Sequence, residues 1–202
     1  MKKYVVMVVA AIMATMSMNA QEKGQLNYVV RLGGSMSTFA NNDDAKMEPN
    51  FNDAIGLNYM LTDQFALGFE VQANYMGAKS KNLDKRVTLL YTNIPLLAKY
   101  YVTPWLALQA GPQVGFLRTA KFDGEKSYKG RKVKDDLKKV DFAIPLGLSF
   151  EPKITSRGDA LLIDLRYHLG LTPVNKKIND GDKSSYNRAI ILTLGIRTDF
   201  GR

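Results

Sequence analysis

One feature constrains the fold of this chain more than any other: apolar side chains recur at every second position over long stretches. Alternate residues are apolar throughout Ile94–Val102. After the short segment Thr103–Trp105 the alternation resumes over Leu106–Phe116. A period of two is that of a β-strand, because successive side chains of a strand point to opposite faces. This part of the chain therefore predicts two antiparallel strands joined by a tight turn, with one apolar face and one small or polar face.

The same alternation recurs along the rest of the chain, and helical periodicity is hard to find after Ala20. The pattern predicts eight strands, at Tyr28–Thr38, Asn52–Leu61, Phe65–Met76, Val87–Val102, Leu106–Arg118, Val140–Phe150, Ala160–Leu171 and Arg188–Phe200. The fourth strand changes phase within Val87–Tyr91, which predicts a β-bulge or a protruding rim there.

Short turns are expected after the second, fourth and sixth strands, and longer polar loops after the others, including 40–50 and 77–85. This asymmetry, with strands of about 10–12 residues, is typical of an all-β, eight-stranded, antiparallel up-and-down transmembrane barrel. Aromatic residues lie near the predicted strand ends, as in the interfacial girdles of such barrels: Tyr28, Tyr59, Phe65, Tyr75, Tyr100, Trp105, Phe116, Phe150 and Phe200.

The first residues predict export. Lys2 and Lys3 precede an apolar run that is too short to span a bilayer, as in a cleaved secretory signal peptide over residues 1–20. The barrel domain would then occupy residues 21–202, and the expected location is the cell outer membrane. The chain contains no cysteine, so the exported protein has neither disulfides nor a lipid-modified cysteine.

The charge of the chain points to membrane partners. The formal net charge of +9 becomes +7 when Lys2 and Lys3 leave with the signal peptide. An exported protein rarely meets nucleic acid, so we expect no nucleic-acid partner. Anionic outer-membrane lipid or glycolipid phosphates, and other envelope proteins, are the expected partners.

Periodicity alone does not say whether the apolar face points outward, because a soluble lipocalin-like carrier shows the same alternation with its apolar face inside. The opposite face of this chain is mostly Gly, Ala, Ser, Asn and Gln, which suits a crowded interior better than a water-facing surface. It also carries charges, and charges in such an interior must pair. We therefore predict a lumenal charge network of Arg31, Glu70, Lys99, Asp164, Arg166, His168, Arg197 and Asp199, with Asp141 and Glu151 on the same face.

A basic loop after the fifth strand is the second candidate site, and would project outside the cell toward glycolipid phosphates or an acidic partner. Its cations include Lys121, Lys126, Lys129, Arg131, Lys132 and Lys134. The alternative interpretation is a solvated loop without a specific ligand. Asn179–Asp182 lacks the full acidic spacing of a calcium loop, and we expect no metal or cofactor.

Three functions remain open at this point. The expected one is a non-enzymatic structural, anchoring or interaction role in the outer membrane. Passive transport through a narrow channel is the second, although side chains should fill an eight-stranded interior. The third is lipid modification, for which His168 is the candidate residue, but no serine-hydrolase motif accompanies it.

Three motifs in order along the chain resemble the PorT-type outer-membrane β-barrel family of Bacteroidetes: Tyr91–Tyr100, Ala110–Gly115, and Ile163–Tyr167 with Gly170–Thr172. The position of Asn93 is often acidic in that family. The resemblance implies an outer-membrane barrel with an accessory role in protein secretion or envelope assembly. Phe200, two residues before the end of the given sequence, is similar to the terminal aromatic of outer-membrane barrels.

Overall fold

The computed structural model describes residues 22–81, 86–123, 137–156, 158–176 and 184–200. The predicted signal peptide and its cleavage site lie outside these ranges. Within them the chain forms one antiparallel sheet and no helix. The strands are β1 (Leu26–Ala40), β2 (Ala45–Lys46), β3 (Glu48–Met60), β4 (Phe65–Ser80), β5 (Arg86–Thr103), β6 (Leu106–Ala110), β7 (Gln113–Asp123), β8 (Val140–Phe150), β9 (Ala160–Pro173) and β10 (Tyr186–Asp199).

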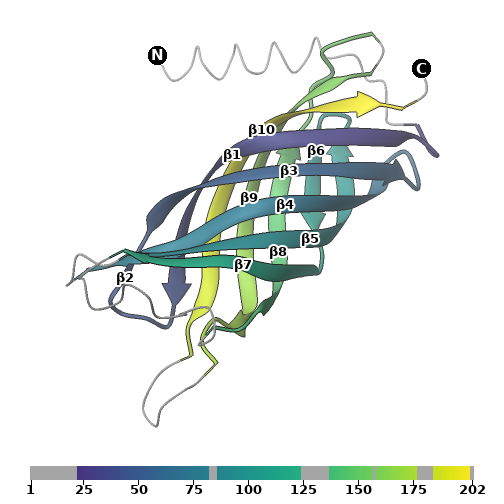
Figure 1. The fold of residues 1–202 in the computed structure, drawn as a ribbon. Helices are drawn as coiled ribbons and strands as arrows, with labels where there is room; N and C mark the ends of the chain where they lie inside the picture. The colour runs from purple at the N-terminus through teal and green to yellow at the C-terminus, as the bar shows by residue number, and fades with distance from the viewer. Residues whose placement is uncertain (1–21, 82–85, 124–136, 157, 177–183, 201–202) are drawn as a thin grey trace, which may run out of the picture.

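The sheet closes on itself. β1 pairs with β10 from Asn27 opposite Asp199 to Ala40 opposite Tyr186, and each long strand pairs with its neighbours in chain order. Figure 1 shows these inclined strands surrounding a single cylinder. β6 and β7 follow one another along the same line between β5 and β8, so together they count as one strand of the barrel. β2 pairs only with the end of β4. The predicted eight-stranded up-and-down barrel is therefore confirmed.

The fifth predicted strand is broken, which is a correction to the sequence interpretation. β6 ends at Ala110 and β7 begins at Gln113, although side-chain alternation continues across the break. Pro112 has no N–H to donate to a neighbouring strand, but its carbonyl accepts a hydrogen bond from Leu96 N–H at 2.9 Å. A proline interrupts the ladder there without changing which side chains face inward.

Strand pairing extends further into the predicted loops than the sequence indicated. Residues 40–50 contain β2 and the beginning of β3, because Glu48 and its neighbours pair with β1. β4 continues through Ser80, and β7 continues through Asp123 opposite Arg86. The predicted irregularity near Val87–Tyr91 is confirmed: the β5–β7 register shifts between Leu90 and Tyr91.

The two faces of the wall differ in chemistry. On β10, the outward residues Leu192 and Leu194 are each 53% exposed, whereas Thr193 between them is buried. The other long strands show the same contrast. The apolar face therefore points outward and the polar face inward, the reverse of a soluble carrier barrel.

Aromatic contacts mark the end of the barrel with the turns 61–64 and 104–105, which we call the short-turn end. Tyr28 and Phe200 pack edge to face with ring centroids 5.3 Å apart, and Trp105 and Phe150 do so at 5.4 Å. The opposite end, where β1 turns toward β3 and β9 toward β10, is the long-loop end. No helix in the described ranges is long and apolar enough to cross a membrane.

The outward orientation predicts the effect of a charge on β10. Replacement Leu194→Lys places an ammonium group in hydrocarbon near the middle of the strand, and we expect it to lower the free energy of unfolding in phospholipid vesicles by about 2–4 kcal/mol. Denaturant titration of the folded protein in vesicles measures this. The control Leu194→Val should change the value by less than about 1.5 kcal/mol. Equal stability of the two variants would contradict an outward, lipid-facing Leu194.

Candidate functional site

The interior of the barrel, the lumen, holds a buried network of charged side chains. Inward positions of β1, β4, β5, β9 and β10 carry it, because the period of two sends every second residue of each strand inside. Seven predicted residues are at most 5% exposed: Arg31, Glu70, Lys99, Asp164, Arg166, His168 and Arg197. The eighth, Asp199, is half-buried at the end of β10, and its side chain faces Arg197.

The middle layer consists of Arg31, Glu70, Asp164 and Arg166. Arg31 forms ion pairs with both Glu70 and Asp164. Arg166 contacts Glu70 through Nη1–Oε2 at 2.8 Å and Nη2–Oε1 at 3.1 Å, a bidentate arrangement. Because β4 and β9 are on opposite walls of the ring, the Glu70–Arg166 pair spans the lumen. Two acids and two bases leave this layer electrically neutral.

Neutral amides complete the middle layer. Gln109 on β6 accepts from Arg166 Nη2 at 2.7 Å and donates to Asp164 Oδ1 at 2.9 Å. Gln72 donates to Glu70 Oε2 at 2.7 Å. Sequence reasoning did not list these glutamines as site residues, although they share the inward parity of the charged residues. These amides give both carboxylates and Arg166 further hydrogen-bond partners inside the barrel. Nε of Arg31 and Nε of Arg166 are buried without a hydrogen-bond partner among the described residues.

The lower layer, toward the short-turn end, is centred on Glu151. Its carboxylate accepts from Lys99 Nζ at 2.6 Å, Tyr101 Oη at 2.9 Å and Arg197 Nη1 at 3.0 Å. Arg197 Nε lies 3.8 Å from Asp199 Oδ1. Two acids again balance two bases, and Tyr101 is a further member that sequence reasoning did not list.

The upper layer, toward the long-loop end, contains His168. Its ring Nε2 lies 3.5 Å from Asp141 Oδ2, and its Nδ1 lies 3.3 Å from Gln113 Nε2. Asn187 also donates to Asp141 Oδ2, at 3.1 Å. No nucleophile or second histidine accompanies His168 among the described residues, and these residues contain no group of three or more His, Cys, Asp or Glu that could hold a metal ion.

Apolar clusters lie beyond the polar layers at both ends of the lumen. The cluster at the short-turn end contains Met60, Ala66, Tyr101 and Ala107. The cluster at the long-loop end contains Met76, Leu89, Tyr91, Leu117, Leu137 and Val174. The lumen is therefore filled with side chains from one end to the other.

Glycines opposite the long charged residues make room for the network. Gly195 pairs with Arg31, and a Cβ there would lie 2.5 Å from Arg31 Cγ. Gly147 pairs with Arg166, and its Cβ would lie 2.9 Å from Arg166 Cγ. The same Cβ atoms would lie even closer to backbone oxygens of the paired strands, 2.1 Å from Val30 O and 2.4 Å from Leu165 O, so a side chain at either position would displace the strand as well as the arginine.

The second predicted site, the basic loop, is described only at its start. Lys121 is exposed and lies within β7, opposite Thr88, because β7 continues to pair with β5 beyond the predicted strand end. The other five candidates lie outside the described residues: Lys126, Lys129, Arg131, Lys132 and Lys134. The predicted calcium-like turn at 179–182 also lies outside them.

Comparison with known proteins identifies the family. A family model described as an outer membrane protein beta-barrel domain matches residues 19–176. The chain belongs to this outer-membrane β-barrel family. The protein is therefore an integral outer-membrane barrel, as its apolar outer face requires.

Solved structures of outer-membrane proteins are similar to this chain at low sequence identity. Ail, the attachment invasion locus protein of Yersinia pestis, is 11% identical over 88% of this chain and 99% of that chain, with a TM-score of 0.48. OprG from Pseudomonas aeruginosa is 12% identical over 91% of this chain and 100% of that chain, with a TM-score of 0.48. Outer membrane protein W of E. coli is 10% identical over 89% of this chain and 100% of that chain, with a TM-score of 0.47. None of the curated proteins matches this chain.

The middle layer predicts a large cost for removing one acid. Glu70→Gln leaves Arg31 and Arg166 facing Asp164 alone, and we expect a loss of about 3–5 kcal/mol in the free energy of unfolding. Urea unfolding in detergent micelles measures it. The control Asp63→Asn removes the same charge from an exposed turn and should cost less than about 0.5 kcal/mol. Similar costs for both variants would contradict a tightly paired middle layer.

Proposed function

We propose that this protein is a closed, non-conducting outer-membrane barrel with a structural, anchoring or protein-interaction role. The filled lumen carries this proposal. The Glu70–Arg166 pair spans the interior, and apolar side chains pack together at both ends. A solute would have to separate buried ion pairs to pass, which costs several kcal/mol for each uncompensated charge. The outer surface and the loops are then the parts that meet other molecules.

The sequence supports the export signal, the ligand of the basic segment and the accessory role that we include in this proposal. Residues 1–20 serve as the export signal, and the basic segment from Lys121 to Lys134 contacts glycolipid phosphates or an acidic envelope protein. The resemblance to PorT-type barrels of Bacteroidetes supports an accessory role in secretion or envelope assembly. No catalytic role is proposed, because His168 contacts Asp141 and Gln113 inside the wall and has no access to a substrate from either end.

Conductance separates this proposal from passive transport. We expect the folded protein, inserted in a planar lipid bilayer, to give no steps above the baseline, since both layers of ion pairs and both apolar clusters block the lumen. A known open porin in the same bilayer provides the positive control. Reproducible single-channel openings that persist in fresh protein preparations would overturn the closed-barrel proposal and favour a narrow channel.

A further inference from the structure

An acidic side chain interrupts the apolar outer face. Asp53 is an exposed outward residue of β3, between Phe51 (52% exposed) and Ile55 (61% exposed). It lies six residues from Tyr59, the exposed aromatic residue near the short-turn end of β3. With the rise and tilt of a membrane strand, Asp53 is about 15 Å from that aromatic level, which places its carboxylate within the hydrocarbon layer. Lipid headgroups and water lie outside this layer.

Asp53 has no partner within its own barrel. Among the residues that the structure describes, none gives its carboxylate a hydrogen bond or an ion pair. An ionisable side chain at this depth is costly, and in membrane proteins such a side chain usually faces another protein group rather than lipid. Asp53 did not figure among the sequence-predicted sites, although it breaks the apolar alternation of its strand. The outer wall therefore needs an external contact at this position.

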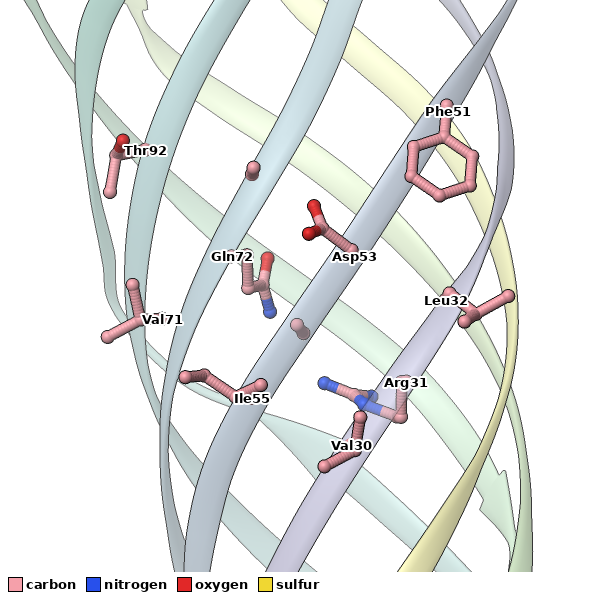
Figure 2. A pocket seen from close by; sticks show the side chains of 11 residues that line it. Val30, Arg31, Leu32, Phe51, Asp53, Ile55, Val71, Gln72 and Thr92 are labelled. Atoms are coloured by element: carbon pink, nitrogen blue, oxygen red, sulfur yellow. The ribbon is translucent and has the colours of Figure 1, made fainter.

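A hollow of about 450 Å³ lies beside Asp53, and Figure 2 shows Phe51, Asp53 and Ile55 along the strand that borders it. Ala73 on β4 pairs with Asp53, and its small methyl group leaves the hollow open. Thr92 on β5, the partner of Ala73, borders the far side. The hollow therefore begins at the carboxylate and extends across two neighbouring strands.

Two inward residues also line the hollow, and both are already bonded inside the lumen. Arg31 forms ion pairs with Glu70 and Asp164, and Gln72 donates to Glu70. Arg31 is 2% exposed and Gln72 is 7% exposed. The side chains that an occupant meets from the membrane are therefore Asp53 and its apolar neighbours.

A second copy of the chain is complementary to this acid. In a two-fold dimer whose axis runs along the membrane normal, every residue keeps its depth, so a residue at the axis meets its own copy. With the axis at Asp53, two carboxyl groups meet inside the hydrocarbon layer. Two ionised carboxylates would repel each other, but two that share a proton form a strong O–H···O hydrogen bond. One negative charge is then spread over two groups, and each group has a partner.

The same axis brings the hollow of one copy opposite an aromatic ring of the other. Strands tilted by about 40° place Phe51 about 5 Å from Asp53 toward the long-loop end and about 4 Å to one side. Ala73 lies about 3 Å from Asp53 toward the same end and about 4 Å to the other side. Rotation about the axis exchanges the two sides. Phe51 of the second copy therefore faces Ala73, where the hollow is open.

We propose that this protein forms a two-fold dimer in the membrane, with Asp53 at the axis and the Phe51 ring of each copy seated over Ala73 of the other. Small residues in a membrane interface let two backbones approach closely, and polar side chains there form hydrogen bonds between the chains. The second copy covers the hollow and supplies the partner that Asp53 lacks. The proposal rests on the interaction role proposed above and names its partner, and it does not depend on a closed lumen.

The test measures association of the folded full-length barrel in phosphatidylcholine vesicles. Energy transfer between donor-labelled and acceptor-labelled barrels, followed as added lipid dilutes the protein, gives the dissociation constant of the dimer. The labels are attached to Asp63→Cys, in an exposed turn of a chain that has no other cysteine. We expect Asp53→Leu to raise this constant about tenfold, because it removes the central hydrogen bond. Asp53→Asn should keep most of the association, since a carboxamide both donates and accepts.

A larger side chain tests the role of the hollow. Ala73→Phe fills the hollow from its own strand, and we expect it to raise the dissociation constant about tenfold or more. The matched control Ala110→Phe adds the same ring at an outward position of β6, away from the hollow, and should leave the constant unchanged.

Disulfide formation tests the contact between the two copies. Barrels with Phe51→Cys and barrels with Ala73→Cys are mixed in the same vesicles and oxidised. We expect a cross-linked dimer, because the two positions approach each other across the axis. In the control mixture Leu194→Cys, an outward position of β10, replaces Phe51→Cys and should give no cross-link to Ala73→Cys.

Three results would overturn the proposal. They are a wild-type protein that stays monomeric at every lipid ratio, a dimer that Asp53→Leu leaves intact, and equal cross-linking in the two mixtures. The first would assign the hollow to a different membrane protein. The folded state of each variant is checked by its heat-dependent gel mobility, and Asp53→Leu should fold at least as well as the wild type because it removes a charge from the lipid-facing surface. Conductance tests the closed barrel separately, so failure here leaves that proposal standing.

Discussion

The pairing of the first long strand with the last is the constraint on which this structure depends. Hydrocarbon offers no hydrogen-bond partners, so every backbone N–H and C=O of a spanning sheet must find one within the sheet. The antiparallel register from Asn27–Asp199 to Ala40–Tyr186 supplies these partners for β1 and β10, which would otherwise be exposed edges. Closure also creates an interior, and the small circumference of eight strands leaves room there only for side chains.

That interior explains the distribution of charge and of glycine. A charge buried in the lumen has a low free-energy cost only when it is paired and hydrogen-bonded. The middle and lower layers each balance two acids with two bases. Long side chains that extend from the wall into a narrow lumen need space beside them, at the paired position of the adjacent strand. Gly56 opposite Glu70 provides it, as do the glycines opposite the two middle-layer arginines: a Cβ at Gly56 would lie 2.6 Å from Glu70 Cγ.

Much of this architecture follows from the sequence, because a period of two fixes which residues share a face. The alternation of apolar and polar residues was enough to predict that Arg31, Glu70 and Arg166 point inward. Parity carries no information about which residues meet across the lumen, since that depends on register and closure among distant strands. The break at Pro112 and the extension of β7 past Lys121 depend on local pairing in the same way.

Asp53 shows a different limit of sequence reasoning. Its position is obvious once the apolar face is known to be outward, yet in the sequence one acid among apolar alternate residues looks like an ordinary exception. In the structure Asp53 is exposed on β3 between Phe51 and Ile55, and the small Ala73 lies opposite it on β4. Which residue of β4 lies beside Asp53 follows only from the pairing of the two strands.

A scan of β10 with single cysteines tests the central claim, that lipid solvates one face of the wall while the other fills a closed lumen. The chain has no cysteine, so each variant carries one label. A fluorophore at positions 190, 192, 194 or 196 should be quenched strongly by lipids with brominated acyl chains, and one at 189, 191 or 193 should be quenched weakly. Equal quenching at both sets of positions, or stronger quenching at the second set, would contradict this account.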